Sequence, residues 1–231
     1  MLDVHLPHGK LHGISDFLIH LFTITVGLLI AVQIESCVEW RHHVHLANEA
    51  RVELRTEIEH NLADLKKAEP SVKIYRQKID DDLAILQRIQ EHRNVTKEQW
   101  RKFSVSSGGV GLTDTAWKTA QITGALAYMP YEEAERYSEI YQAQDQLRVI
   151  SNKPVEDAAA ITGLLAKFHR GPGKITVDQA SAMAEQLGQM RLHMAIGDTN
   201  LHVAIEQCEA FLEHRKARDD FETNLKSGLN K

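Results

Sequence analysis

Hydrophobic positions in this chain begin as a continuous run and later become periodic. The run FLIHLFTITVGLLIAVQI starts at Phe17, and no charged residue interrupts it before Glu35. A helix rises about 1.5 Å per residue, so about 20 residues cross a hydrocarbon core of about 30 Å. The pattern therefore predicts one transmembrane helix over residues 14–35, preceded by an N-terminal tail of residues 1–13.

A cleaved signal peptide and a lipoprotein signal are the alternatives to an uncleaved anchor. The run exceeds the usual signal-peptide core of about 7–15 residues, Lys10 is the one lysine before it, and no small-x-small cleavage site follows it. Cys37 follows the run as a lipoprotein cysteine would, but Glu35 stands where such signals have a small residue. The sequence favours an uncleaved anchor.

Beyond the span, apolar residues recur at the steps of three and four that amphipathic helices require. We expect the first helix to continue to about Ala68 and to stop at Pro70, with a second helix folding back on it. Residues 36–103 are thus expected to form a membrane-proximal coiled helix and a helical hairpin. The apolar positions are Leu54, Ile58, Leu62 and Leu65 before the proline, and Val72, Tyr75, Ile79, Leu83, Leu86 and Ile89 after it.

Helix-start signals divide the rest of the chain. Thr96 and Gln99 form a capping box for a short helix that ends near Phe103. A glycine-rich loop, SVSSGGVGLT, then opens a helical segment of residues 104–170. Within that segment we expect a helix from Asp114 to about Tyr128.

Prolines predict the next two helix starts. Pro130 and Pro154 each stand at a first helical position and are followed by acidic residues, which favour a helix N-terminus. The run Gly-Pro-Gly at 171–173 is the clearest linker. It opens residues 171–218, expected to form a long C-terminal helix before a polar, frayed tail of residues 219–231.

The start of that final helix has its own capping box, formed by Thr176 and Gln179. Its expected core positions are Leu187, Met190, Met194, Leu201, Ile205, Cys208 and Leu212. The fold class is therefore all-α, with one N-terminal transmembrane helix that continues into a helical hairpin or bundle domain.

One side of the span is small and polar. Its Gly-x-x-x-Ala element, Gly27 to Ala31, would let another helix backbone approach closely, and His20 and Thr23 could hydrogen-bond across such an interface. An ionisable group inside an apolar run indicates function, although His20 is near enough to the boundary to reach the headgroups. The expected interface residues lie at steps of three or four: Asp16, His20, Thr23, Gly27, Ala31 and Glu35.

Histidines and carboxylates suggest a second, metal-based reading. Glu39 and His42 have the spacing by which a helix offers two ligands in carboxylate-bridged di-iron bundles. Such a site needs this motif twice, and it occurs once. The final helix could contribute further ligands, and the simpler reading is a solvated face near the headgroups. The candidate metal ligands are Glu39, His42, His202, Glu206 and Glu209.

The sequence lacks the motifs of nucleotide binding and of nucleic-acid binding. The glycines at 108–111 have neither the Lys-Ser/Thr of a P-loop nor a dinucleotide-binding context, so we expect a flexible loop and no cofactor. The net charge of −5 comes from interspersed charges, and no basic stripe indicates nucleic acid. A cluster of aromatic residues serves either core packing or a partner groove: Trp117, Tyr128, Tyr131, Tyr137 and Tyr141.

Two stretches of the chain carry a resemblance. These are VGLLIAVQIESCVEW with the helix after it, covering residues 17–67, and LTDTAWKTAQITGALAYMPYEEAERYSEIY, covering residues 112–141. The chain resembles a broad group of uncharacterised bacterial single-pass membrane proteins, with a GLLIA-x-x-(I/L)E-type span followed by a helical domain. The resemblance implies the bacterial inner membrane as location, and it brings no reaction, cofactor or partner.

Orientation has two opposing indications. Near the span, Lys10 and the N-terminal amine stand against Arg41 and Arg51, which barely favours a cytoplasmic domain. Members of the resembling group tend to have a basic N-terminal flank, which implies a periplasmic domain. This chain has histidines there instead, and we lean slightly towards the periplasm.

The sequence thus leads to two functional hypotheses. The first is a membrane-anchored helical interaction or accessory protein. It would self-associate, or dock on a larger membrane complex, through its span and the coiled segment from Arg41 to Lys67. Its partners are the lipid bilayer and either a second copy or another membrane subunit. The alternative is a metal-dependent, di-iron-like membrane enzyme.

Overall fold

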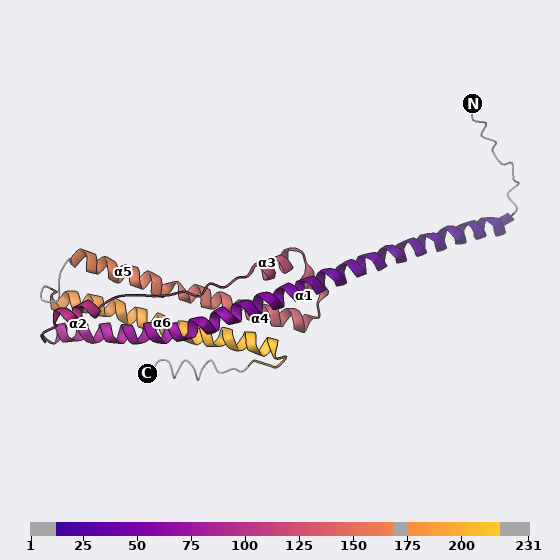
Figure 1. Cartoon of the computed structure of the whole chain (residues 1–231). Helices are drawn as coiled ribbons and strands as arrows, with labels where there is room; N and C mark the ends of the chain where they lie inside the picture. Colours follow the sequence, from indigo (N-terminus) through magenta and orange to yellow (C-terminus); the bar gives the residue numbers. More distant parts are fainter. Residues whose placement is uncertain (1–12, 169–174, 218–231) are drawn as a thin grey trace, which may run out of the picture. The chain divides into compact units, whose positions relative to one another are not determined.

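The computed structural model describes residues 13–168 and 175–217, and these residues are all-helical with no strand (Figure 1). Two compact units divide the chain, residues 1–49 and residues 50–231. The boundary lies inside the first helix, downstream of the expected end of the span at residue 35. We describe the two units separately and call the second one the bundle.

Helix α1 (Gly13–Gln90) contains the apolar run and enters the bundle. In the described part of the chain it is the one helix long and apolar enough to cross a membrane, judged by length and composition. None of its most apolar 18-residue window is buried. The span expected from the sequence therefore has a helix of the required kind.

Helix α1 does not stop at Pro70, so the expected hairpin within residues 36–103 is wrong. Pro70 lies inside α1 with its side chain exposed. A proline inside a helix costs about 3 kcal/mol, whereas each fully buried Leu or Ile contributes about 1.5–3 kcal/mol. Burial on both sides of the proline outweighs its cost. The buried residues are Leu54, Ile58 and Leu65 before it, and Ile79, Leu86 and Ile89 after it.

Short elements return the chain along the bundle. The capping box of Thr96 and Gln99 is confirmed at the start of α2 (Lys97–Lys102). A stretch without regular structure follows, then α3 (Thr115–Ile122) and the 3-10 helix η1 (Ala125–Tyr128). The single helix expected from Asp114 to Tyr128 is therefore broken. Its break is at Gly124, whose φ of 73° is the left-handed conformation that ends helices.

The remaining helices match their expected starts closely. Pro130 caps α4 (Tyr131–Ser151), and Pro154 is the second residue of α5 (Lys153–Phe168). The capping box of Thr176 and Gln179 opens α6 (Val177–Leu212) as expected. The Gly-Pro-Gly linker at 171–173 and the tail at 219–231 lie outside the described residues.

Side-chain pairs reveal how the long helices of the bundle are aligned. Arg51 pairs with Glu133 and Asn61 with Gln144, separations of 82 and 83 residues. This constant offset means that α1 and α4 run parallel. Parallel neighbours need a return segment, and the stretch between α2 and α3 supplies it (Figure 1).

Helix α6 runs antiparallel to its neighbours. Along α1, Lys66 pairs with Glu209 near the end of α6, and Gln90 pairs with Ser181 near its start. Along α4 and α5, Gln144 meets Cys208 and Asp157 meets His193. The pairing with α6 continues in the same direction from α4 into α5. Both helices therefore pack antiparallel to α6, one after the other.

The apolar core fills the bundle along its length. Of the positions expected in α6, Leu187, Met190, Met194, Leu201 and Cys208 are buried, while Ile205 and Leu212 are partly buried. Around Met183 and Leu187, one cluster joins α1, α5 and α6 with the turn after α1. The bundle thus buries its own apolar surface.

Candidate functional site

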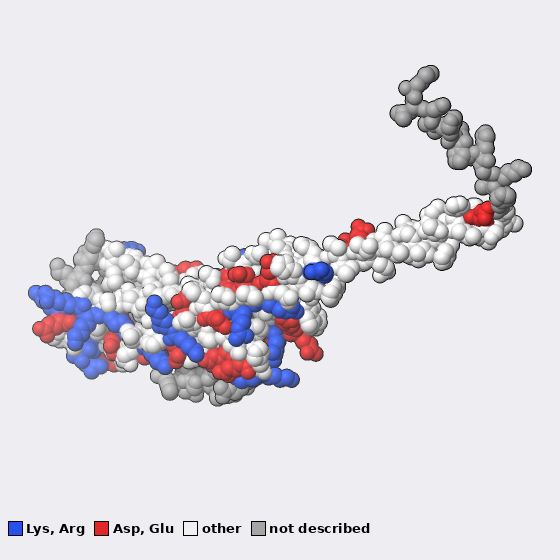
Figure 2. Space-filling view, turned by 45° about the vertical axis from the view of Figure 1, so that its right-hand side comes forward, with Lys and Arg blue, Asp and Glu red and all other residues white. Residues whose placement is uncertain are grey.

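The small face of the span is open in the structure. Gly27 lies in α1, and a Cβ atom built there would meet nothing within 4 Å. Neighbouring apolar side chains are equally uncovered, with Phe22 and Ile24 exposed by 69% and 70%. Figure 2 shows this stretch almost without charge between its acidic ends. The expected interface residues Asp16, His20, Thr23, Gly27, Ala31 and Glu35 all lie on α1.

Polar groups in the span are only partly satisfied by the helix itself. Thr23 donates its hydroxyl hydrogen to the Ile19 carbonyl at 2.9 Å, which leaves its oxygen free to accept. Thr25 does the same with the Leu21 carbonyl at 2.8 Å. An acceptor on the small face is therefore available to a donor on another helix.

Trp40 is an exposed aromatic residue near the apolar run that the sequence analysis did not single out. It lies shortly after the apolar run, directly before Arg41, and is 63% exposed. Tryptophan followed by a basic residue is typical of a membrane–water boundary, where the indole sits at the headgroups. The signal was present in the sequence as an aromatic residue just beyond the run.

The coiled segment from Arg41 to Lys67 contributes apolar side chains to the core of the bundle. Its apolar stripe, Leu54, Ile58 and Leu65, is completely buried inside the bundle. What this segment presents outward is mainly charged, including i,i+4 ion pairs such as Arg55 with Glu59. Exposed ion pairs of this kind contribute little, about 0–1 kcal/mol. Apolar association through this stripe would require the bundle to open.

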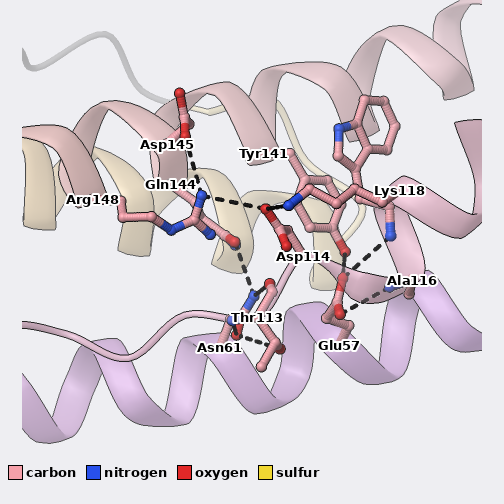
Figure 3. Close-up of polar contacts among 11 residues, drawn as sticks. Glu57, Asn61, Thr113, Asp114, Ala116, Lys118, Tyr141, Gln144, Asp145 and Arg148 are labelled. Carbon is pink, nitrogen blue, oxygen red and sulfur yellow. Dashed lines mark hydrogen bonds and ion pairs between the residues drawn. The ribbon is translucent and has the colours of Figure 1, made fainter.

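A buried polar network joins α1, α4 and the return segment (Figure 3). The Asn61 amide donates to the Thr113 carbonyl at 2.7 Å and to the Gln144 side-chain oxygen at 2.9 Å. In return, its oxygen accepts from the Thr113 backbone N–H at 3.0 Å and the Thr113 hydroxyl at 3.1 Å. The Gln144 amide donates to the Cys208 sulfur at 3.4 Å, which extends the network to α6.

Glu57 forms the second half of this network, one turn of α1 earlier. Its carboxylate accepts from the backbone N–H groups of Ala116 at 3.0 Å and Trp117 at 3.3 Å. It also accepts from the Tyr141 hydroxyl at 2.7 Å. Glu57 thus supplies the N-terminal cap that α3 does not obtain from Asp114, whose side chain makes no capping bond.

Burial disfavours the charged forms of one thiol and two phenols in and beside the network. Burial raises the pKa of the Cys208 thiol to about 11 and that of the Tyr137 phenol to about 12. Burial, helped by the hydrogen bond to Glu57, raises the pKa of Tyr141 further. The hydrogen bonds of the network link α1, α4, α6 and the return segment at fixed positions along the helices.

The return segment lies closely against α1. A Cβ atom at Gly108 would come within 2.9 Å of Cε2 in the Tyr75 ring. Together with the Asn61–Thr113 bonds, this approach fixes the segment at two points along α1. The loop expected from its glycines is present, and it contacts α1 at Gly108 and Thr113.

Candidate metal ligands do not form a centre in the described residues, where no group of three or more His, Cys, Asp or Glu side chains comes together. His202 lies 3.6 Å from the Asp198 carboxylate. Glu209 pairs with Lys66 at 2.6 Å, and Glu206 pairs with Arg215. Glu39 and His42 lie on α1 in the first unit. Ion pairs thus occupy two of the three candidate carboxylates, Glu206 and Glu209.

Aromatic side chains of the cluster divide into two groups. Trp117 stacks on Tyr141 with ring centres 5.0 Å apart, and Tyr137 packs on Phe211 at 5.0 Å. Core packing is thus their use. Tyr128 and Tyr131 remain exposed.

A shallow groove of about 580 Å³ lies between α4 and the end of α6. Its walls carry three acidic and three basic side chains: Glu132, Glu135, Glu139, Arg136, Arg215 and Lys216. The opposite charges balance one another, and Arg215 is bound to glutamates of its own helix end. The groove therefore selects neither anions nor cations.

Comparison of the chain with protein-family models, curated proteins and solved structures finds no match.

Proposed function

We propose that this protein is a membrane-anchored helical interaction protein that associates through its span, either with a second copy or with another membrane subunit. The bundle is the part that this anchor would hold at the membrane. The proposed location is the bacterial inner membrane, with the bundle on the periplasmic side.

One observation carries the proposal: the two units use their apolar surface differently. Side chains of the bundle such as Leu54 and Met190 are fully buried, whereas the span buries none of its most apolar window. Lipid satisfies the apolar side chains, but Gly27 leaves a notch that lipid tails fill less well than a close helix. The Thr23 oxygen and His20 add polar groups that another helix can bind.

Association can be tested by measuring the mass of the full-length protein in mild detergent, using light scattering and native mass spectrometry on one sample. We expect a discrete oligomer or a stoichiometric membrane subunit. Gly27→Ile should reduce that association, because the larger side chain fills the notch. Val32→Ile is the control, since it adds bulk about 140° away around the helix.

Two results would contradict the proposal. A monomer without a co-purifying subunit would remove the interaction function altogether. An assembly that Gly27→Ile and Val32→Ile affect equally would show that the small face is not the contact. Helicity measured by circular dichroism should be unchanged in both variants, which separates loss of association from loss of folding.

A further inference from the structure

The end of α6 turns the chain back towards α4. His214 has a φ of 54°, the left-handed conformation that often follows the last turn of a helix. Its N–H donates to the Phe211 carbonyl at 3.2 Å, and the N–H of Arg215 donates to the Ala210 carbonyl at 2.9 Å. These two bonds form a Schellman motif, so the direction in which the chain leaves α6 is fixed.

Residues 215–217 then lie along the groove between α4 and the end of α6. All three line it, and the Arg215 carbonyl accepts a hydrogen bond from the Arg136 guanidinium of α4 at 3.3 Å. Ala217 is the last of the described residues, and it still lines the groove. The residues that follow it therefore begin at the groove wall.

Charges in the groove match the sequence that follows Ala217. Residues 218–222 read RDDFE, one basic residue and three acidic ones around a phenylalanine. In the described part of the chain Arg136 makes one hydrogen bond, to a neutral carbonyl, although a guanidinium has five donors. Three glutamates of the wall form no ion pair with a described residue: Glu132, Glu135 and Glu139. A groove of balanced charge selects no simple ion, but it is complementary to a peptide that carries both signs.

An aromatic residue completes the match. The groove includes the apolar side chains of Ile140 and Phe211, and Phe211 is only partly buried. Phe221 is four residues beyond Ala217, which is at most about 14 Å along an extended chain. Phe221 can therefore reach these side chains, and a pair of aromatic rings adds to the stabilisation that burial gives.

We propose that the groove binds residues 218–222 of the same chain, with Phe221 packed on Phe211 and Asp219 or Asp220 paired with Arg136. The contact is separate from association through the span. It keeps the groove closed to other peptides, so a partner that binds there must displace the chain's own segment. The frayed tail expected from the sequence predicts the opposite, an open groove.

Disulfide formation in the full-length protein tests this placement. Cys37→Ser and Cys208→Ser remove the native thiols, and Glu222→Cys puts a thiol in the proposed segment. The second cysteine is Glu139→Cys, in the groove, or Ser138→Cys, as the matched control. Ser138 is exposed, does not line the groove and points about 100° away around α4.

Oxidation with copper-phenanthroline in dilute detergent solution gives the rate of intramolecular disulfide formation. We expect position 139 to react at least about five-fold faster than position 138, because a segment that does not bind reaches both at similar effective concentrations. Phe221→Ser should lower the rate at position 139 to that at position 138. Leu229→Ser, outside the proposed contact, should leave the rate unchanged. Circular dichroism checks that all variants keep the same helicity.

Equal rates at the two positions, or a rate at position 139 that Phe221→Ser leaves unchanged, overturn the proposal. Disulfides that link two molecules, and that form more slowly on dilution, overturn it as well, because they place the segment on a second copy. None of these results bears on the small face of the span, since the loss of association in Gly27→Ile is measured independently.

Discussion

Replacing Asn61 by Leu tests whether the buried network holds the helices in register. Asn61 is completely buried, and its side chain takes part in four hydrogen bonds, three with Thr113 and one with Gln144. Leucine has a similar size but can make none of them. The variant therefore removes polar pairing with little change in volume.

The expected cost follows from what each partner loses. Gln144 is only 1% exposed, so its carbonyl oxygen is left buried without a donor, at a cost of about 1–3 kcal/mol. Thr113 is exposed and can turn to water, so its lost bonds together cost about 1 kcal/mol. We expect Asn61→Leu to lower the free energy of unfolding by about 2–4 kcal/mol.

Urea unfolding of the full-length protein in detergent, followed by circular dichroism, measures this free energy. The double variant Asn61→Leu with Gln144→Leu is the decisive comparison, because replacing both partners leaves no orphaned amide. It should be about 1–2 kcal/mol more stable than the sum of the two single losses predicts. A single-variant cost below about 0.5 kcal/mol, or strict additivity, would refute a network that fixes register.

Other predictions concern separate parts of the bundle. Gly108→Ala should lower the free energy of unfolding by about 1 kcal/mol, because the added Cβ meets the Tyr75 ring of α1. Gly109→Ala should lower it less, because nothing lies within 4 Å of a Cβ there. The urea midpoints of the two variants measure the difference. Burial raises the pKa of Asp82, so this group favours the folded state when protonated, and its contribution is lost as pH rises through that pKa. The stability of the wild type relative to Asp82→Asn should therefore increase as pH falls, and a flat difference would exclude the effect. A maleimide at neutral pH should label exposed Cys37 but not buried Cys208, whose thiol pKa is about 11, and mass spectrometry of the peptides detects both outcomes.

Local signals explain which parts of the fold could be read from the sequence. The capping boxes at Thr96 and Thr176 satisfy backbone groups within three residues. Their hydrogen bonds therefore do not depend on distant parts of the chain. The span is equally local, because its apolar run alone sets its length and character. The starts of α2 and α6 were predicted correctly, and the apolar run lies in a helix long enough to cross a membrane.

Distant packing decided the elements that the sequence did not reveal. Pro70 is a local stop signal, and buried residues on either side of it override that signal. Asn61 and Gln144 are separated by 83 residues, and neither carries a mark that identifies its partner. The close approach of Gly108 to α1 was not predicted, because it depends on the distant Tyr75 ring.

In the span, too, only residues that belong to a local pattern could be singled out from the sequence. Gly27 and Ala31 form a recognisable local pattern, and the sequence pointed to them. Gln33 belongs to no such pattern. Within the described residues its side-chain amide forms no hydrogen bond. A polar residue at the end of an apolar run is easily taken for the membrane boundary.

We propose that stability and recognition depend on different parts of this chain. In the bundle, the apolar residues Leu54, Ile58 and Leu65, the Asn61 and Gln144 amides and the Glu57 carboxylate all bind other parts of the bundle itself. The span has the reverse balance, with a notch at Gly27 and an amide at Gln33 that the chain itself does not satisfy. Substitutions in the bundle should change the free energy of unfolding without changing association. Substitutions on the small face of the span should change association without changing the free energy of unfolding. A span variant that unfolds the bundle, or a bundle variant that dissociates a folded assembly, would show that this separation is wrong.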